Sequence, residues 1–202
     1  MSYNCITPPT FDVNNYNNWS EFLEHEGYVV IRDILNSEEK NDFFMTFKQD
    51  FNTLSPDFNF DDPNTWSIKT YPGMFGKGMC VFNGTGQSNF MWKLRLNSKI
   101  QSIYKNIYNT DELITSLDGF SFFFSKKQKT KRWHHIDQNP SNTILSYQGS
   151  YNYFKVSDDD AGFVVAPKSH IGFNPSVTHQ RDWIMVDPSI NWNEQVVKLK
   201  IP

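Results

Sequence analysis

A histidine and an aspartate two residues apart are the side chains in this sequence whose types and spacing best fit metal chemistry. His135 and Asp137 flank Ile136 in a short run of β-type residues. Because side chains alternate across a strand, the imidazole and the carboxylate should lie on one face. The spacing predicts metal-binding atoms within about 5 Å of each other, since two ligands of one ion each bind at about 2.0–2.2 Å. An ion pair at the edge of a strand is the alternative interpretation.

Two ligands from one strand are part of the two-histidine, one-carboxylate site of non-haem Fe(II) oxygenases, in which the second histidine comes from a distant strand. The other histidines fit that role less well. His170 follows a Pro-Lys-Ser turn, and His179 lies in a polar segment. We predict that neither of them completes the set of ligands. His134 precedes His135 directly and should therefore face the other side of the strand.

Four blocks of sequence carry a pattern that extends well beyond the His-x-Asp tripeptide. They are residues 22–35, 86–95, 133–140 and 162–170. In this order they resemble the phytanoyl-CoA dioxygenase-like family of Fe(II)/2-oxoglutarate oxygenases. The last block is similar to the family's Pro-Gly-Ser-His turn, with Lys168 in place of the glycine. The resemblance extends from the first block to the end of the chain.

This resemblance implies an α+β fold, in which N-terminal helices pack on a double-stranded β-helix of the jelly-roll or cupin-like type. It implies Fe(II) held by His135 and Asp137, 2-oxoglutarate as the cosubstrate, and hydroxylation of a small-molecule substrate. It also places Tyr151 and Arg95 near the cosubstrate. Ordinary sheet packing for Tyr151 and a surface ion pair for Arg95 are the alternatives.

The C-terminal residues depart from the family pattern. In the family, a second iron-binding histidine and an arginine that pairs with 2-oxoglutarate follow the Pro-Gly-Ser-His turn. This sequence reaches Pro202 where the strand with that histidine should begin. We therefore expect an incomplete metal triad and a domain without its last strands, whose open sheet edge favours self-association or pairing with a second chain. The alternative function is a non-catalytic, truncated or split remnant that acts as a binding or interaction protein.

Composition excludes several classes of protein. The chain has 202 residues, of which 38% are hydrophobic and 16% aromatic, so it should fold. The length fits a single domain over residues 20–202, preceded by a flexible arm over residues 1–19. A net charge of -3 excludes a generally basic nucleic-acid binder. The basic run at residues 126–132 is predicted to be a solvated hairpin tip, with a cationic rim that attracts an anionic cosubstrate or substrate as the alternative. The absence of signal-peptide and membrane-span patterns predicts a cytoplasmic protein without a membrane partner.

Local patterns predict helices in the first half of the chain and short strands in the second. Asn36 and Glu39 have the spacing of a capping box that opens a long helix. Ser20 and Gly27 have the types that begin and end a short one. Two more helices are expected from residue 98 and over residues 110–117. The expected strands are residues 28–31, 120–124, 133–137, 143–154, 162–166 and 196–201, and an irregular segment is expected over residues 54–86.

Overall fold

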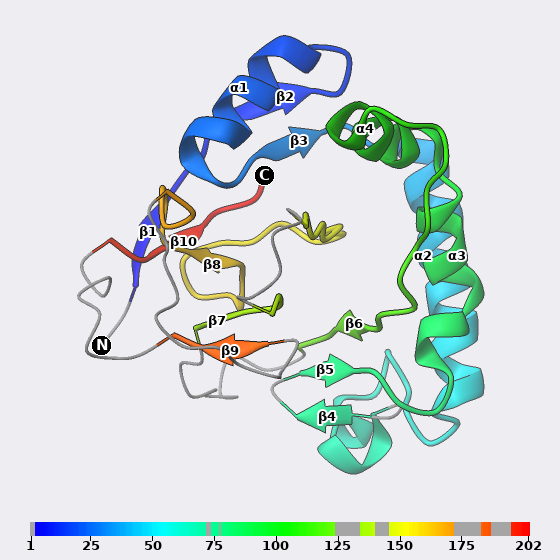
Figure 1. Cartoon of the computed structure of the whole chain (residues 1–202). Coiled ribbons are helices and arrows are strands. Elements are labelled where there is room, and N and C mark those ends of the chain that lie inside the picture. Colours follow the sequence, from blue (N-terminus) through cyan, green and yellow to red (C-terminus); the bar gives the residue numbers. More distant parts are fainter. Residues whose placement is uncertain are drawn as a thin grey trace. The chain divides into compact units, whose positions relative to one another are not determined.

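The computed structural model describes residues 3–71, 74–76, 78–123, 134–139, 146–171, 183–186 and 195–202. Helices occupy the first half of the chain, and short strands in small sheets occupy both halves (Figure 1). The fold is therefore mixed α+β, as predicted. The chain divides into two compact units, which are described separately below. Unit 1 comprises residues 1–11, 17–30 and 129–202, and unit 2 comprises residues 12–16 and 31–128.

Unit 2 contains three of the described α-helices. They are α2 (Ser37–Leu54), α3 (Asn89–Arg95) and α4 (Ser98–Tyr108). Three 3-10 turns accompany them, η1 (Pro63–Thr65), η2 (Ile68–Thr70) and η3 (Thr85–Gln87). An antiparallel sheet is built in the order β4 (Met74–Gly76), β5 (Met79–Cys80) and β6 (Phe120–Ser121).

The predicted capping box at the start of α2 is confirmed. The Asn36 side chain accepts from the Glu39 amide at 2.9 Å, and the Glu39 carboxylate accepts from the Asn36 amide at 2.7 Å. Two of the four amides that lack a partner within the helix are thereby satisfied. The helix then presents Phe47 and Phe51, which are 7% and 0% exposed.

These two phenylalanines are the centre of an aromatic core in unit 2. The Phe47 ring meets Phe90 edge to face at 5.1 Å between centroids, and the Phe51 ring lies 4.7 Å from Phe58. Phe120 also contacts both rings of the pair. Such edge-to-face contacts add about 0.5–1.5 kcal/mol each to the free energy gained from burial. This core explains much of the chain's aromatic content.

Unit 1 contains most of helix α1 (Tyr16–Glu26) and a three-stranded sheet. The sheet has the order β1 (Asn4–Ile6), β10 (Val197–Leu199) and β8 (Val164–Val165), with β1 parallel and β8 antiparallel to β10. Figure 1 shows the blue N-terminal strand beside the red C-terminal one. A separate antiparallel pair consists of β7 (His135–Ile136) and β9 (Ile184–Met185). Strands β2 (Thr10–Asp12) and β3 (Val30–Arg32) also pair, and the chain crosses between the units within them.

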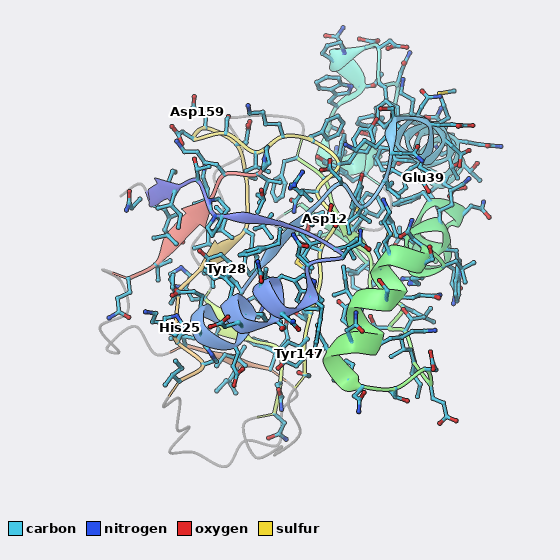
Figure 2. All side chains as sticks on the ribbon, turned by 90° about the horizontal axis from the view of Figure 1, so that it is seen from above. Asp12, His25, Tyr28, Glu39, Tyr147 and Asp159 are labelled. Carbon is cyan, nitrogen blue, oxygen red and sulfur yellow. The ribbon has the colours of Figure 1, made fainter. Side chains whose placement is uncertain are left out.

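A buried lysine holds the turn over residues 157–160 in unit 1. Lys198 is 7% exposed, and its ammonium donates to the carbonyls of Ser157, Asp158 and Asp160 at 3.0, 2.5 and 2.9 Å. Figure 2 shows Asp159 on the outside of this turn. The three aspartates before Gly162 thus belong to a connecting turn.

Several segments differ from the predictions. Residues 4–6 and 10–12, expected within a flexible arm, form β1 and β2, and α1 begins at Tyr16. The prediction of a helix over residues 110–117 is wrong. Asn109 ends α4 in the left-handed conformation, and the Ile114 side chain is fully exposed and so has no surface to pack against. The described part of the strand expected over 143–154 is irregular, and helix α3 was not predicted.

Candidate functional site

The ladder between β7 and β9 positions the predicted His-x-Asp motif. His135 is opposite Met185 and Ile136 is opposite Ile184. The amide of Val186 donates to the carbonyl of His134 at 2.9 Å, which extends the pairing by one residue. Figure 1 shows β9 alongside β7. Because side chains at paired positions point to one face, His135 shares its face with Met185.

The imidazole and the carboxylate of the motif point toward each other. His135 Nε2 lies 3.3 Å from Asp137 Oδ1, and the two side chains are 23% and 40% exposed. Asp137 follows the last residue of β7 directly, so its position still depends on the strand. The predicted proximity, within about 5 Å, is confirmed. Only His135 lies in β7, however, and Asp137 is in the bend that follows the strand.

The distance between these two atoms fits ligands of one metal ion. With metal–ligand bonds of about 2.1 Å, donor atoms 3.3 Å apart subtend an angle of about 100° at the ion. This angle lies between the octahedral value of about 90° and the tetrahedral value of about 109°. A neutral imidazole nitrogen and a carboxylate oxygen are also the donor set that divalent iron and related metals accept. The pair therefore has the chemistry and the geometry for two of a metal's coordination positions.

Two further side chains surround the pair, and neither was predicted. Gln148 Nε2 donates to Asp137 Oδ2 at 3.1 Å. The Trp183 ring stands edge-on to the His135 ring, at 6.5 Å between centroids and 86° between planes. Gln148 lies eleven residues beyond the aspartate, and Trp183 immediately precedes β9. No periodic pattern in the sequence connects either residue to the motif.

His134 has a different partner. Its Nε2 atom lies 2.9 Å from the Tyr3 hydroxyl, and the two rings are 5.8 Å apart. This contact involves the N-terminal segment that leads into β1.

The structure brings no third ligand to His135 and Asp137 among the residues that it describes. In those ranges, no three His, Cys, Asp or Glu side chains are grouped closely enough to hold a metal. His170 lies at the end of α1, where its Nε2 atom is 2.7 Å from the Glu24 carbonyl. His179, Trp133 and the basic run at residues 126–132 lie outside the described residues.

The two residues expected near a cosubstrate have different surroundings. Arg95, in unit 2, donates to the carbonyls of Gly86 and Asp118 at 2.5 and 2.9 Å, and its guanidinium lies 5.3 Å from the centre of the Trp92 ring. These contacts join η3 to the segment before β6. Tyr151 belongs to unit 1 and is partly buried in the irregular segment after Gln148.

The chain is similar to a curated fungal protein. It is 25% identical over 170 residues to a protein of Aspergillus versicolor named "Ava biosynthesis cluster protein O", and the match covers 83% of this chain and 55% of that protein. The chain thus spans about half the length of this relative. No family model and no solved structure matches the present chain. Within the described residues, no helix is long and apolar enough to cross a bilayer.

Proposed function

We propose that the chain is an Fe(II)/2-oxoglutarate-dependent dioxygenase-like protein, with His135 and Asp137 as two protein ligands of the iron. The observation that carries this proposal is the 3.3 Å distance between His135 Nε2 and Asp137 Oδ1, held by the β7–β9 ladder. The same distance is that of an ion-pair contact between the two side chains, and it also suits two atoms that share an ion.

Two other observations support the proposal. Four blocks of sequence resemble phytanoyl-CoA dioxygenase-like oxygenases, and the jelly roll of that family is the finer fold that we propose for the short antiparallel pairs β7–β9 and β8–β10. The relative from Aspergillus versicolor is named as a biosynthesis cluster protein. Hydroxylation of a small molecule is one kind of reaction that biosynthesis uses.

In this proposal, the chain's own residues hold and shield the metal. The His135 imidazole provides a neutral nitrogen, and Asp137 provides one negative charge that offsets part of the ion's charge. The Trp183 ring stands edge-on to the imidazole, at 6.5 Å between centroids. Iron held there would supply, with 2-oxoglutarate and oxygen, the oxidising power for hydroxylation.

The proposal does not include Arg95 as a cosubstrate ligand, because the structure uses both of its terminal nitrogens for main-chain carbonyls. Tyr151 remains the proposed neighbour of 2-oxoglutarate. Its support is the resemblance, together with its place three residues after Gln148, whose side chain contacts Asp137.

The experiment is a turnover assay on the full chain with Fe(II), ascorbate and 2-oxoglutarate, with succinate as the product measured. If the two protein ligands are enough for turnover, wild type forms succinate and His135→Ala does not. His25→Ala is the matched control, because His25 also lies beside a carboxylate, at 2.9 Å from Glu26. Metal binding without succinate formation would favour the alternative of a non-catalytic binding protein. Succinate formation that survives His135→Ala would contradict the assignment of the ligand.

A further inference from the structure

The two oxygens of Asp137 have different partners. Oδ1 faces His135 Nε2 at 3.3 Å, and Oδ2 accepts a hydrogen bond from Gln148 Nε2 at 3.1 Å. We propose that Gln148 is a positioning residue, which holds Oδ2 so that Asp137 binds a metal through Oδ1 alone. This inference rests on the proposed metal site and adds to it the residue that determines how the carboxylate coordinates.

The carboxylate needs such a partner because it is 40% exposed and its terminal torsion has a broad, two-fold preference. A carboxylate free to rotate would exchange its two oxygens or bind the metal through both. The hydrogen bond at Oδ2 removes that freedom. It also leaves a coordination position of the metal open, which a site that must accept further ligands requires.

Glutamine is chemically suited to this role. An ionised carboxylate only accepts hydrogen bonds, so the amide must present its NH₂ group to Oδ2. The amide is neutral, so it does not repel a cation at Oδ1 as a lysine or arginine would. Carboxylates that bind metals are commonly oriented by a hydrogen bond of this kind, and loss of such a partner typically weakens metal affinity about 10- to 100-fold.

A second contact fixes the segment that carries Gln148. The Ser146 hydroxyl donates to Gln138 Oε1 at 2.9 Å. The two residues that directly follow β7 are therefore each held by this segment, Asp137 by Gln148 and Gln138 by Ser146. This second hydrogen bond provides a matched control, because it joins the same two segments and does not involve Asp137.

The test measures Mn(II) affinity by the electron paramagnetic resonance signal of the free ion, with the 202-residue chain. Gln148→Ala and Gln148→Met, the second of which keeps the side chain's size, should both raise the Kd about 10- to 100-fold. Ser146→Ala should leave it within about two-fold. The visible spectrum of bound Co(II), which reports coordination number, should change for both Gln148 variants, while the thermal midpoint of the metal-free chain stays the same.

The outcomes separate this inference from the proposed function. If wild type binds no Mn(II), or His135→Ala binds it as well as wild type, both proposals are wrong. If wild type binds Mn(II) and His135→Ala does not, but the Gln148 variants keep the wild-type Kd and Co(II) spectrum, the role of Gln148 alone is overturned. A Kd that rises equally for Ser146→Ala would also overturn it, because the effect would then belong to the segment and not to the amide.

Discussion

The imidazole of His170 occupies the space in which a side chain at Gly27 would lie. A Cβ atom added to Gly27 would be 2.4 Å from His170 Nδ1, and the other ring nitrogen of His170 is 2.7 Å from the Glu24 carbonyl. The amide of Lys168 donates to the Glu26 carbonyl at 2.8 Å. The turn over residues 167–171 thus satisfies carbonyls at the end of α1 that have no partner within the helix.

Gly27→Ala should therefore destabilise the chain in two ways. The residue has φ +79°, which costs a non-glycine residue about 1–2 kcal/mol. The new methyl group would also displace His170 and its hydrogen bond, at a cost of about 1 kcal/mol. Urea denaturation should show a loss of about 2–3 kcal/mol in the free energy of unfolding.

Gly84→Ala is the matched control for this prediction. Gly84 has φ +75°, and a Cβ atom there would meet nothing within 4 Å. The Gly84→Ala variant should lose only the backbone contribution, about 1–2 kcal/mol, from its free energy of unfolding. Equal losses for the two variants would contradict the role that we assign to His170.

Lys198→Met should destabilise unit 1. The ammonium donates to three carbonyls of the turn over residues 157–160. Methionine keeps most of the side chain's volume but removes these charged hydrogen bonds, with an expected loss of about 2 kcal/mol in the free energy of unfolding. Lys200→Met is the comparison, because Lys200 makes an exposed ion pair with Asp158 at 2.7 Å and should contribute little. The prediction is wrong if the two variants unfold at the same urea concentration.

Cys80 should resist thiol reagents while the chain is folded. Its side chain is fully buried, and burial raises the pKa of its thiol from 9.0 to about 12. The reactive thiolate is therefore scarce at pH 8. Ellman's reagent should label Cys5, which is partly exposed, and reach Cys80 only in denaturant. Rapid native labelling of a Cys5→Ser variant would contradict this.

The same pKa shift predicts how stability depends on alkaline pH. The folded state favours the protonated thiol more strongly than the unfolded state does. The contribution of Cys80 to stability is thus fully present below the unfolded pKa of 9.0 and is lost as the pH rises toward 12. Cys80→Ala should make the free energy of unfolding less dependent on pH between 9 and 11, as measured by urea denaturation at a series of pH values.

Features that depend on neighbouring residues could be predicted from the sequence. The capping box joins Asn36 to a residue three positions later, and Gly27 adopts the left-handed conformation that ends α1. The closeness of His135 and Asp137 follows from their two-residue spacing, although Asp137 lies in the bend just after β7. In each case a short segment of chain contains both the chemical groups and the spacing that determine the result.

Features that depend on distant segments could not be predicted. Helix α3 begins where Asp50, from α2, accepts from the amide of Phe90 at 2.9 Å and from the Asn89 side chain at 2.8 Å. The N-cap residue Ser88 makes no side-chain capping bond, and the carboxylate that accepts from the first turn comes from forty residues away. Strand β1 likewise forms through parallel pairing with β10 at the other end of the chain. Gln148 and Trp183 reach the candidate site in the same way, through pairing of segments and not through spacing.

Calorimetric titration of the full chain with Mn(II) tests the central claim most directly. We predict saturable binding of one ion to wild type, retained by the control variant His25→Ala and lost in both His135→Ala and Asp137→Asn. Asp137→Asn keeps the shape of the side chain and removes only its charge and its strength as a ligand. Loss of Mn(II) binding in this variant would therefore show that the carboxylate coordinates the ion. No saturable binding by wild type, or binding that persists at wild-type affinity in His135→Ala, would contradict the claim.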